Sequence, residues 1–162
     1  MTQIAELLAA NRNYAAARAA VAGAHPGRHL AIVTCMDARI DTFAVLGLHL
    51  GDAHVIRNAG GRVTLDVQRS LALSCHVLGV DTVVVMQHTK CGLLGVTDLE
   101  LHDLTGADLG FLGFDDHSAA LHEDIEVLTN TPYLHPLKVI AGFVYEVDTG
   151  AITDVVRWER PE

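Results

Sequence analysis

The sequence predicts an α/β protein with a mainly parallel central sheet that is covered by helices. Two short and almost wholly apolar runs, residues 29–34 and 82–86, are typical of strands buried on both faces of a parallel sheet. Between them, residues 63–78 carry apolar side chains at helical spacing. Strands that alternate with helices in this way indicate units in which a helix connects neighbouring parallel strands.

An Ala-rich stretch, residues 3–22, opens the chain and predicts a helix, because alanine favours helix strongly. Pro26 and Gly27 follow it and separate it from the first strand. We expect residues 1–28 to form an N-terminal helical arm. Its apolar face is thin, so the arm is expected to lean on a larger body such as another subunit.

The first half of the body contains the clearest patterns. Its elements are a strand at 29–34, a short helix at 41–50, a strand at 53–56 with a loop at 57–61, a helix at 63–78 and a strand at 82–86. The apolar residues of the long helix form one stripe: Val67, Leu71, Cys75 and Leu78. Cys75 is therefore expected to be a core thiol rather than a ligand.

The second half of the body gives weaker patterns. A helix is expected from Gly92 onward, whereas residues 101–117 give no firm pattern. The remaining elements are a helix at 118–129, a strand at 138–145 and a strand at 151–156. A turn at 148–150 joins these two strands into a C-terminal antiparallel hairpin. With no internal repeat or linker, residues 1–162 are expected to form a single domain.

Composition narrows the possible partners. The net charge of −9, from 11 basic and 20 acidic residues, argues against a nucleic acid or an anionic membrane surface. No apolar run approaches the ~18 residues that a membrane-spanning helix needs. The N-terminus lacks the pattern of a signal peptide, so we expect a cytoplasmic location. Three cysteines in such a reducing compartment favour metal binding or catalysis over disulfides.

Two polar clusters follow apolar strands. Residues 34–39, with the sequence TCMDAR, end the first strand, and residues 88–92, with the sequence HTKCG, end the strand at 82–86. Open parallel sheets bind ligands at the carboxyl ends of their strands. If these strands are neighbours, Cys35 can meet His88 and Cys91. Two thiolates and one imidazole suit zinc, and three protein ligands leave a fourth position open, as in catalytic sites.

Asp37 and Arg39 lie two residues apart after the first strand. They could form an ordinary surface ion pair, or a fixed dyad in which Arg39 holds the carboxylate by two parallel hydrogen bonds. Two thiolates neutralise the charge of zinc, so a water there should be acidified less than in a three-histidine site. In a dyad, Asp37 would orient this water while Arg39 keeps Asp37 away from the metal. Breaking the pair would let Asp37 occupy the fourth position, which is an on/off hypothesis.

At these residues the chain resembles β-class carbonic anhydrases. The matching motifs, in the family's order, are Cys35-Met36-Asp37-Ala38-Arg39, Arg57-Asn58-Ala59-Gly60 and His88-Thr89-Lys90-Cys91-Gly92. The resemblance implies one zinc ion per subunit, bound by Cys35, His88 and Cys91, and a catalytic dyad of Asp37 and Arg39. It implies attack of a zinc-bound hydroxide on carbon dioxide to give bicarbonate. It also implies a homodimer or larger homo-oligomer, with the N-terminal helix packed on the partner.

Two other functions remain open at this point. The chain is similar to a compact subgroup that resembles carbonyl sulfide hydrolases, which use the same zinc site, and the motifs do not separate the two substrates. A non-catalytic, zinc-stabilised binding protein would instead need a fourth protein ligand and no Arg39. The chain also departs from some members, because none of its glutamines, Gln3, Gln68 and Gln87, lies shortly before Cys35.

Overall fold

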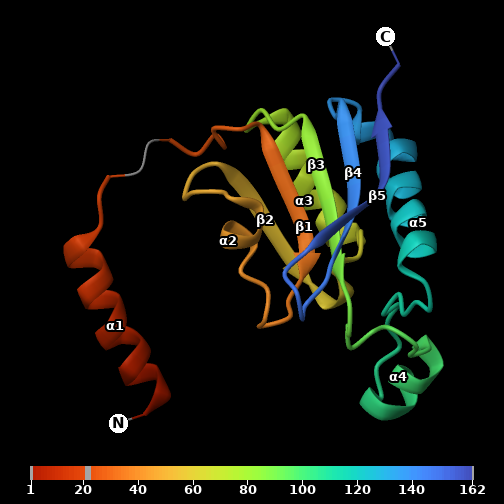
Figure 1. Ribbon diagram of the computed structural model, residues 1–162, viewed down its shortest axis with the longest axis horizontal. Helices are drawn as coiled ribbons and strands as arrows, with labels where there is room; N and C mark the ends of the chain where they lie inside the picture. Colours follow the sequence, from red (N-terminus) through yellow and green to blue (C-terminus); the bar gives the residue numbers. More distant parts are fainter. Residues whose placement is uncertain (1, 21–22, 162) are drawn as a thin grey trace.

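The computed structural model describes residues 2–20 and 23–161 (Figure 1). Its centre is a five-stranded sheet in the order β2-β1-β3-β4-β5. The strands are β1 (Leu30–Cys35), β2 (Ala53–Asn58), β3 (Thr82–His88), β4 (Val139–Tyr145) and β5 (Ile152–Glu159). The first four are parallel, and β5 pairs antiparallel with β4. The predicted fold class, with its C-terminal hairpin, is confirmed.

The helices are α1 (Gln3–Ala17), α2 (Thr42–Leu46), α3 (Leu65–His76), α4 (Asp98–Thr105) and α5 (His117–Asn130). Two short 3-10 turns, η1 (Ala59–Gly61) and η2 (Pro132–Leu134), complete the regular structure. Helices α3 and α5 lie against the same face of the sheet and share one core, whereas α2 belongs to the core on the other face. Helices therefore cover the sheet on both sides.

The two cores explain why the strands are almost wholly apolar. Successive side chains of a strand point to opposite faces of the sheet. In β3, Val83 and Val85 join the core under α3 and α5, while Val84 and Met86 join the other core. Because both faces are covered, no position in the middle of the strand is left for a polar side chain.

The stripe predicted on α3 points into the core. Val67, Leu71 and Cys75 are all buried there, and the Thr64 side chain caps the helix by accepting a hydrogen bond from the Val67 N–H. Burial raises the pKa of the Cys75 thiol to about 11. Cys75 is thus an apolar core thiol on the face opposite to the two polar clusters.

The predicted helix from Gly92 onward is wrong. Residues 92–97 form turns, and helix α4 begins only at Asp98, where Thr97 and Glu100 form a reciprocal capping box. Leu93 is buried and Leu94 pairs with Phe114 through an isolated bridge, so these apolar side chains pack from a loop. The second half of α4 falls in residues 101–117, which show no firm pattern in the sequence.

Two other helices end well before the residue predicted from the sequence. The helix expected at 41–50 covers only Thr42–Leu46, because Asp41 caps its start and Gly47 ends it in a left-handed conformation at φ 60°. The arm helix ends at Ala17 rather than near residue 22, and residues 21 and 22 lie outside the described ranges. Boundaries of this kind depend on single capping residues more than on periodicity.

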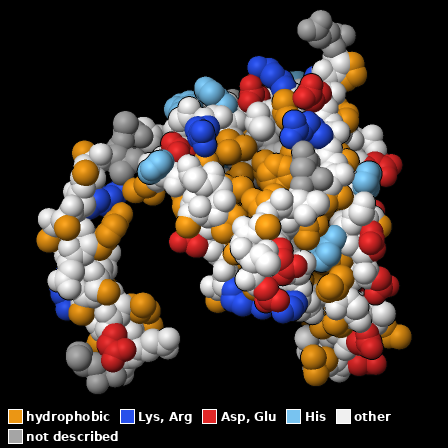
Figure 2. Space-filling model, viewed as in Figure 1, with side chains coloured by type: hydrophobic (Ala, Val, Ile, Leu, Met, Phe, Trp, Pro, Cys, Tyr) orange, Lys and Arg blue, Asp and Glu red, His pale blue; other side chains and the backbone are white. Residues whose placement is uncertain are grey.

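Helix α1 stands away from the sheet in Figure 1. None of its residues is buried by the described part of the chain, and the side chains of Ile4, Leu7, Leu8 and Tyr14 are more than half exposed. The space-filling view shows this arm as a separate column with hydrophobic side chains on its surface (Figure 2). Within residues 2–20 and 23–161, no helix is long and apolar enough to cross a membrane.

Candidate metal centre

Strand order brings the two polar clusters together. Strands β1 and β3 are parallel neighbours, with Thr34 opposite Met86, and the Thr34 hydroxyl donates to the Met86 carbonyl at 2.8 Å. Cys35 is the last residue of β1 and His88 the last of β3, so both lie at the carboxyl edge of the sheet. Cys91 follows in the turn after β3. From the sequence we expected both polar clusters to lie just past the strands, whereas Cys35 and His88 are the last residues of β1 and β3.

The thiols of Cys35 and Cys91 and the imidazole of His88 form a group that could hold a metal ion. Their candidate ligand atoms lie within 4.8 Å of one another, and the three residues are only 5%, 7% and 0% exposed, respectively. Zinc bonds of roughly 2.0–2.3 Å would draw such atoms slightly closer together. This is the donor set of a zinc site with one position left for a small ligand.

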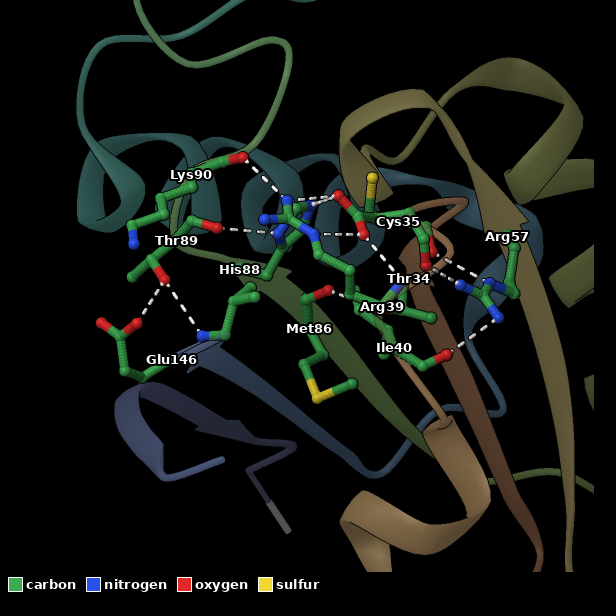
Figure 3. A network of polar contacts seen from close by, with 12 residues as sticks. Thr34, Cys35, Arg39, Ile40, Arg57, Met86, His88, Thr89, Lys90 and Glu146 are labelled. Carbon is green, nitrogen blue, oxygen red and sulfur yellow. Dashed lines mark hydrogen bonds and ion pairs between the residues drawn. The ribbon is translucent and has the colours of Figure 1, made fainter. Parts of the chain in front are cut away.

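The tautomer of His88 fits this interpretation. Its Nδ1 lies 2.9 Å from the Thr89 carbonyl, which can only accept, so Nδ1 carries the proton (Figure 3). The Nε2 atom is buried and has no hydrogen-bond partner among the described residues. A buried polar atom without a partner is costly. A metal ion beside the two thiols would satisfy it, because a neutral imidazole binds metals through its free nitrogen.

The two sulfur atoms interact strongly with each other. A hydrogen bond from Cys91 lowers the pKa of Cys35, and the same bond raises the pKa of Cys91, whose burial acts in the same direction. Backbone N–H groups of Asp37 and Gly60 also favour the Cys35 thiolate, and that of Leu93 favours the Cys91 thiolate. The backbone near both sulfurs thus lowers their pKa and favours the thiolate form that a metal ion binds.

Asp37 and Arg39 form a fixed pair. Arg39 Nε donates to Asp37 Oδ1 at 2.9 Å, Arg39 Nη2 donates to Oδ2 at 2.6 Å, and the Arg39 backbone N–H donates to Oδ1 at 2.9 Å. These hydrogen bonds hold the pKa of Asp37 well below its usual range. Asp37 Oδ2 also lies 3.8 Å from His88 Nε2, so the carboxylate faces the cluster while it stays paired.

A second arginine holds the loop after β1. Arg57, near the end of β2, donates to the Cys35 carbonyl at 2.9 Å, to the Ile40 carbonyl at 3.2 Å and to the Asp37 carbonyl at 2.6 Å (Figure 3). One guanidinium thus fixes the last residue of β1 and two positions of the irregular loop that follows it. The sequence motif included Arg57 but assigned it no role. That role follows from the pairing of β1 with β2, which places Arg57 opposite Thr34, next to the loop that it holds.

A cavity of about 310 Å³ opens beside the cluster. Its polar wall contains Cys35, Asp37 and Cys91, and its apolar wall contains Met36, Ala59, Gly60 and Leu93. A Cβ on Gly60, which has φ +73°, would lie 2.8 Å from the Leu93 side chain, so glycine leaves this wall open. Asn58, by contrast, exchanges two hydrogen bonds with the backbone of Arg62 and shapes the turn.

The fold and this cluster define a class of protein: an α/β protein with a candidate Cys-His-Cys metal centre at the carboxyl edge of a parallel sheet. Comparison with known proteins agrees. A family model described as carbonic anhydrase matches residues 30–108. The chain is 37% identical over 161 residues to β-carbonic anhydrase 1 of Mycobacterium tuberculosis, a match that covers 96% of this chain and 99% of that protein. The chain belongs to the β-carbonic anhydrase family.

Solved structures and a second group of relatives extend the comparison. The crystal structure of a carbonic anhydrase from Streptococcus mutans matches with a TM-score of 0.86 and 39% identity, covering 96% of this chain and 99% of that one. A carbon disulfide hydrolase from Saccharolobus solfataricus is 32% identical over 152 residues, covering 75% of this chain and 74% of that protein. The family therefore includes relatives named for two different substrates.

Proposed function

We propose that the protein catalyses the reversible hydration of carbon dioxide to bicarbonate. One observation carries the proposal: the Cys35, His88 and Cys91 donor atoms converge beside an ionised Asp37 at the wall of a small, partly apolar cavity. These three residues would hold one zinc ion per subunit. When bound, zinc would acidify a water molecule and so supply a hydroxide nucleophile.

The chain's own residues would orient the reaction. Asp37 stays ionised because Arg39 donates to both of its oxygens, and it can accept a hydrogen bond from a water molecule in the cavity. A carboxyl group with so low a pKa cannot store a proton near pH 7, so Asp37 would position the nucleophile while the proton leaves by another route. The apolar wall of Met36, Ala59 and Leu93 suits a small linear molecule without charge.

Hydrolysis of a sulfur analogue is the second candidate. It is favoured by the relatives named carbon disulfide hydrolase, which match at 32% identity. Carbonyl sulfide and carbon disulfide are linear like carbon dioxide and need the same nucleophile. Identical zinc ligands therefore do not distinguish these substrates, and the shape of the apolar wall would decide between them.

The test compares both chemistries on one zinc-loaded sample. Stopped-flow measurement of carbon dioxide hydration and measurement of sulfide release from carbonyl sulfide and carbon disulfide would rank the substrates. We expect Cys91→Ala to lose both zinc and activity. Cys75→Ala removes a buried thiol on the other face of the sheet and should keep both. A zinc-loaded wild-type protein that turns over none of these substrates would contradict the proposal.

The same proposal includes the assembly and the location of the protein. We propose that residues 1–162 act as one domain, with residues 1–28 as an arm that packs on a partner in a homodimer or larger homo-oligomer. The exposed apolar side chains of α1 support this arrangement. A cytoplasmic location is supported by three free cysteines, which suit a reducing compartment.

A further inference from the structure

In the loop after β3, Thr89 makes three hydrogen bonds to the β4–β5 hairpin (Figure 3). The Thr89 hydroxyl donates to Glu146 Oε1 at 2.8 Å and accepts from the backbone N–H of Val147 at 3.1 Å. The backbone N–H of Thr89 donates to the Tyr145 carbonyl at 2.9 Å. Three hydrogen bonds thus fix one residue of the loop against the hairpin.

The backbone carbonyls of Thr89 and Lys90, in the same loop, orient two side chains of the candidate site. The Thr89 carbonyl accepts from His88 Nδ1 at 2.9 Å, and the Lys90 carbonyl accepts from Arg39 Nη2 at 3.1 Å (Figure 3). Lys90 has φ +55°, a left-handed conformation that costs a non-glycine residue roughly 1–2 kcal/mol. Such a conformation persists where the surroundings fix it.

From these contacts we propose that Thr89 and Glu146 are positioning residues of the active site. By fixing the Thr89–Lys90 dipeptide, they orient the His88 imidazole toward the metal position and the Arg39 guanidinium toward Asp37. The hairpin lies more than fifty residues after Thr89 in the sequence, but it helps to position the side chains of the site. The catalytic part of this inference rests on the proposed function, whereas its effect on metal binding does not.

Glu146 is better placed for this role than the neighbouring ion pair between Lys90 and Asp148. Glu146 Oε1 accepts from both the Thr89 hydroxyl and the Asp148 backbone N–H, so it ties the turn of the hairpin to the loop. The Lys90 and Asp148 side chains are 60% and 61% exposed, and exposed pairs contribute only about 0–1 kcal/mol. Asp148 therefore provides a control on the same hairpin.

The experiment uses two substitutions at one position. Thr89→Val removes the hydroxyl with little change of shape, whereas Thr89→Ser keeps it. Zinc affinity is measured by competition with a chromogenic chelator, and kcat for carbon dioxide hydration is measured in parallel. We expect Thr89→Val to lower both by about tenfold, the smaller end of the effect of losing outer-shell hydrogen bonds. The zinc affinity and kcat of Thr89→Ser and Asp148→Asn should stay within about twofold of the wild-type values.

Thermal unfolding of the zinc-free protein shows whether Thr89→Val is folded. If it is not, a second pair of variants, at Glu146, tests the same inference. Glu146→Ala loses the acceptor, whereas Glu146→Gln keeps an amide oxygen that can accept, so only the first should lose zinc affinity. Wild-type zinc affinity in Thr89→Val, or an equal loss in Thr89→Ser, would overturn the inference. The zinc affinities of Thr89→Val and Thr89→Ser could also differ while the wild type hydrates no carbon dioxide. That result would support the positioning role of Thr89 and contradict the proposed function.

Discussion

Two arginines organise the loop after β1, and both depend on the shape of the guanidinium. Arg57 donates to three backbone carbonyls at once, and Arg39 holds both oxygens of Asp37. A lysine carries the same charge but presents a single ammonium group without this planar fork. The position of Asp37 beside the cluster therefore depends on arginine geometry as well as on charge.

Replacing Arg39 tests this dependence. In Arg39→Ala, Asp37 loses two side-chain hydrogen bonds, so its pKa should rise toward the ordinary value and its oxygens should move. We expect kcat/KM to fall by on the order of 100-fold, the scale of a misplacement of about 1 Å. Arg39→Lys should also lose activity, because one ammonium cannot reproduce the two parallel bonds. Activity is measured over pH 6–9 at saturating zinc.

A matched control for Arg39 lies on α3. Arg69 pairs with Asp66 three residues earlier, but the two side chains are 77% and 72% exposed. Neither residue lines the cavity beside the cluster, so Arg69→Ala, which removes an arginine and an exposed ion pair, should leave activity unchanged. Equal losses in the two variants, or full activity in Arg39→Ala, would show that the dyad does not position Asp37.

The buried thiol of Cys75 should make stability fall at alkaline pH. Its pKa is raised to about 11 in the folded protein, above the ~8.5 of an exposed thiol. The folded protein favours the neutral thiol. The contribution of Cys75 to the free energy of unfolding is therefore complete below the pKa of the thiol in the unfolded chain, and it is lost as the pH rises toward 11. One pKa unit corresponds to ~1.4 kcal/mol, which gives a loss of about 2.5 kcal/mol by pH 10.5.

Urea unfolding of the zinc-free protein at several pH values between 7.5 and 10.5 measures this loss. The free energy of unfolding should decline less steeply with pH in Cys75→Ala than in the wild type. Because Cys75 lies outside the metal cluster, the comparison leaves the candidate ligands unchanged. Parallel curves for the two proteins would mean that other groups produce the alkaline decline.

At the scale of elements, the end of β1 is shaped by the close approach of η1. Gly61 has φ +67°, and a Cβ there would lie 2.9 Å from the Cys35 backbone nitrogen and 3.0 Å from the Thr34 carbonyl carbon. These are backbone atoms of a paired strand, so they cannot move aside as a flexible side chain could. The backbone around Cys35 is therefore fixed from two sides, by η1 and by the neighbouring strands.

Two glycine substitutions separate the effect of this contact from that of backbone conformation. Gly61→Ala should cost on the order of 3 kcal/mol, because overpacking adds to the left-handed strain. Gly47 has a similar φ of +60° but no atom within 4 Å of its added Cβ, so Gly47→Ala should cost only about 1 kcal/mol. Denaturant unfolding measures both. Equal costs would show that the contact with β1 is not tight.

At the scale of the whole molecule, the arm and the body have different roles. The body buries two apolar cores, whereas α1 buries no residue within the described part of the chain. An isolated helix of 15 residues is marginal in water. A stable α1 therefore needs a surface to pack on, and a second copy of the chain is the partner that we propose.

Changing the apolar side chains of α1 tests this assembly. We expect the double variant Leu7→Ser/Leu8→Ser to weaken the oligomer, because both leucines are more than half exposed in the single chain. Sedimentation velocity across a range of protein concentrations measures the change. Asn11→Ser, on the same helix, changes no apolar side chain and should assemble like the wild type. If both variants match the wild type, the arm has another role.

Much of the fold follows from local patterns, and its errors have local causes. The apolar runs of β1 and β3 and the stripe on α3 determined the α/β class. The helix expected from Gly92 was wrong because Leu93 and Leu94 pack from a loop against distant residues. The true start was visible in the sequence as the capping box of Thr97 and Glu100, a signal that apolar spacing alone does not include.

The sequence by itself determined which residues could form the site: two cysteines, a histidine and an Asp–Arg pair next to apolar strands. Only the tertiary structure decided that β1 and β3 are neighbours, that Arg57 clamps the loop and that the Lys90 carbonyl orients Arg39. The reason is physical. Side-chain periodicity records which face of an element is buried, whereas hydrogen bonds between residues 20–60 positions apart depend on strand order and register, which no local pattern specifies.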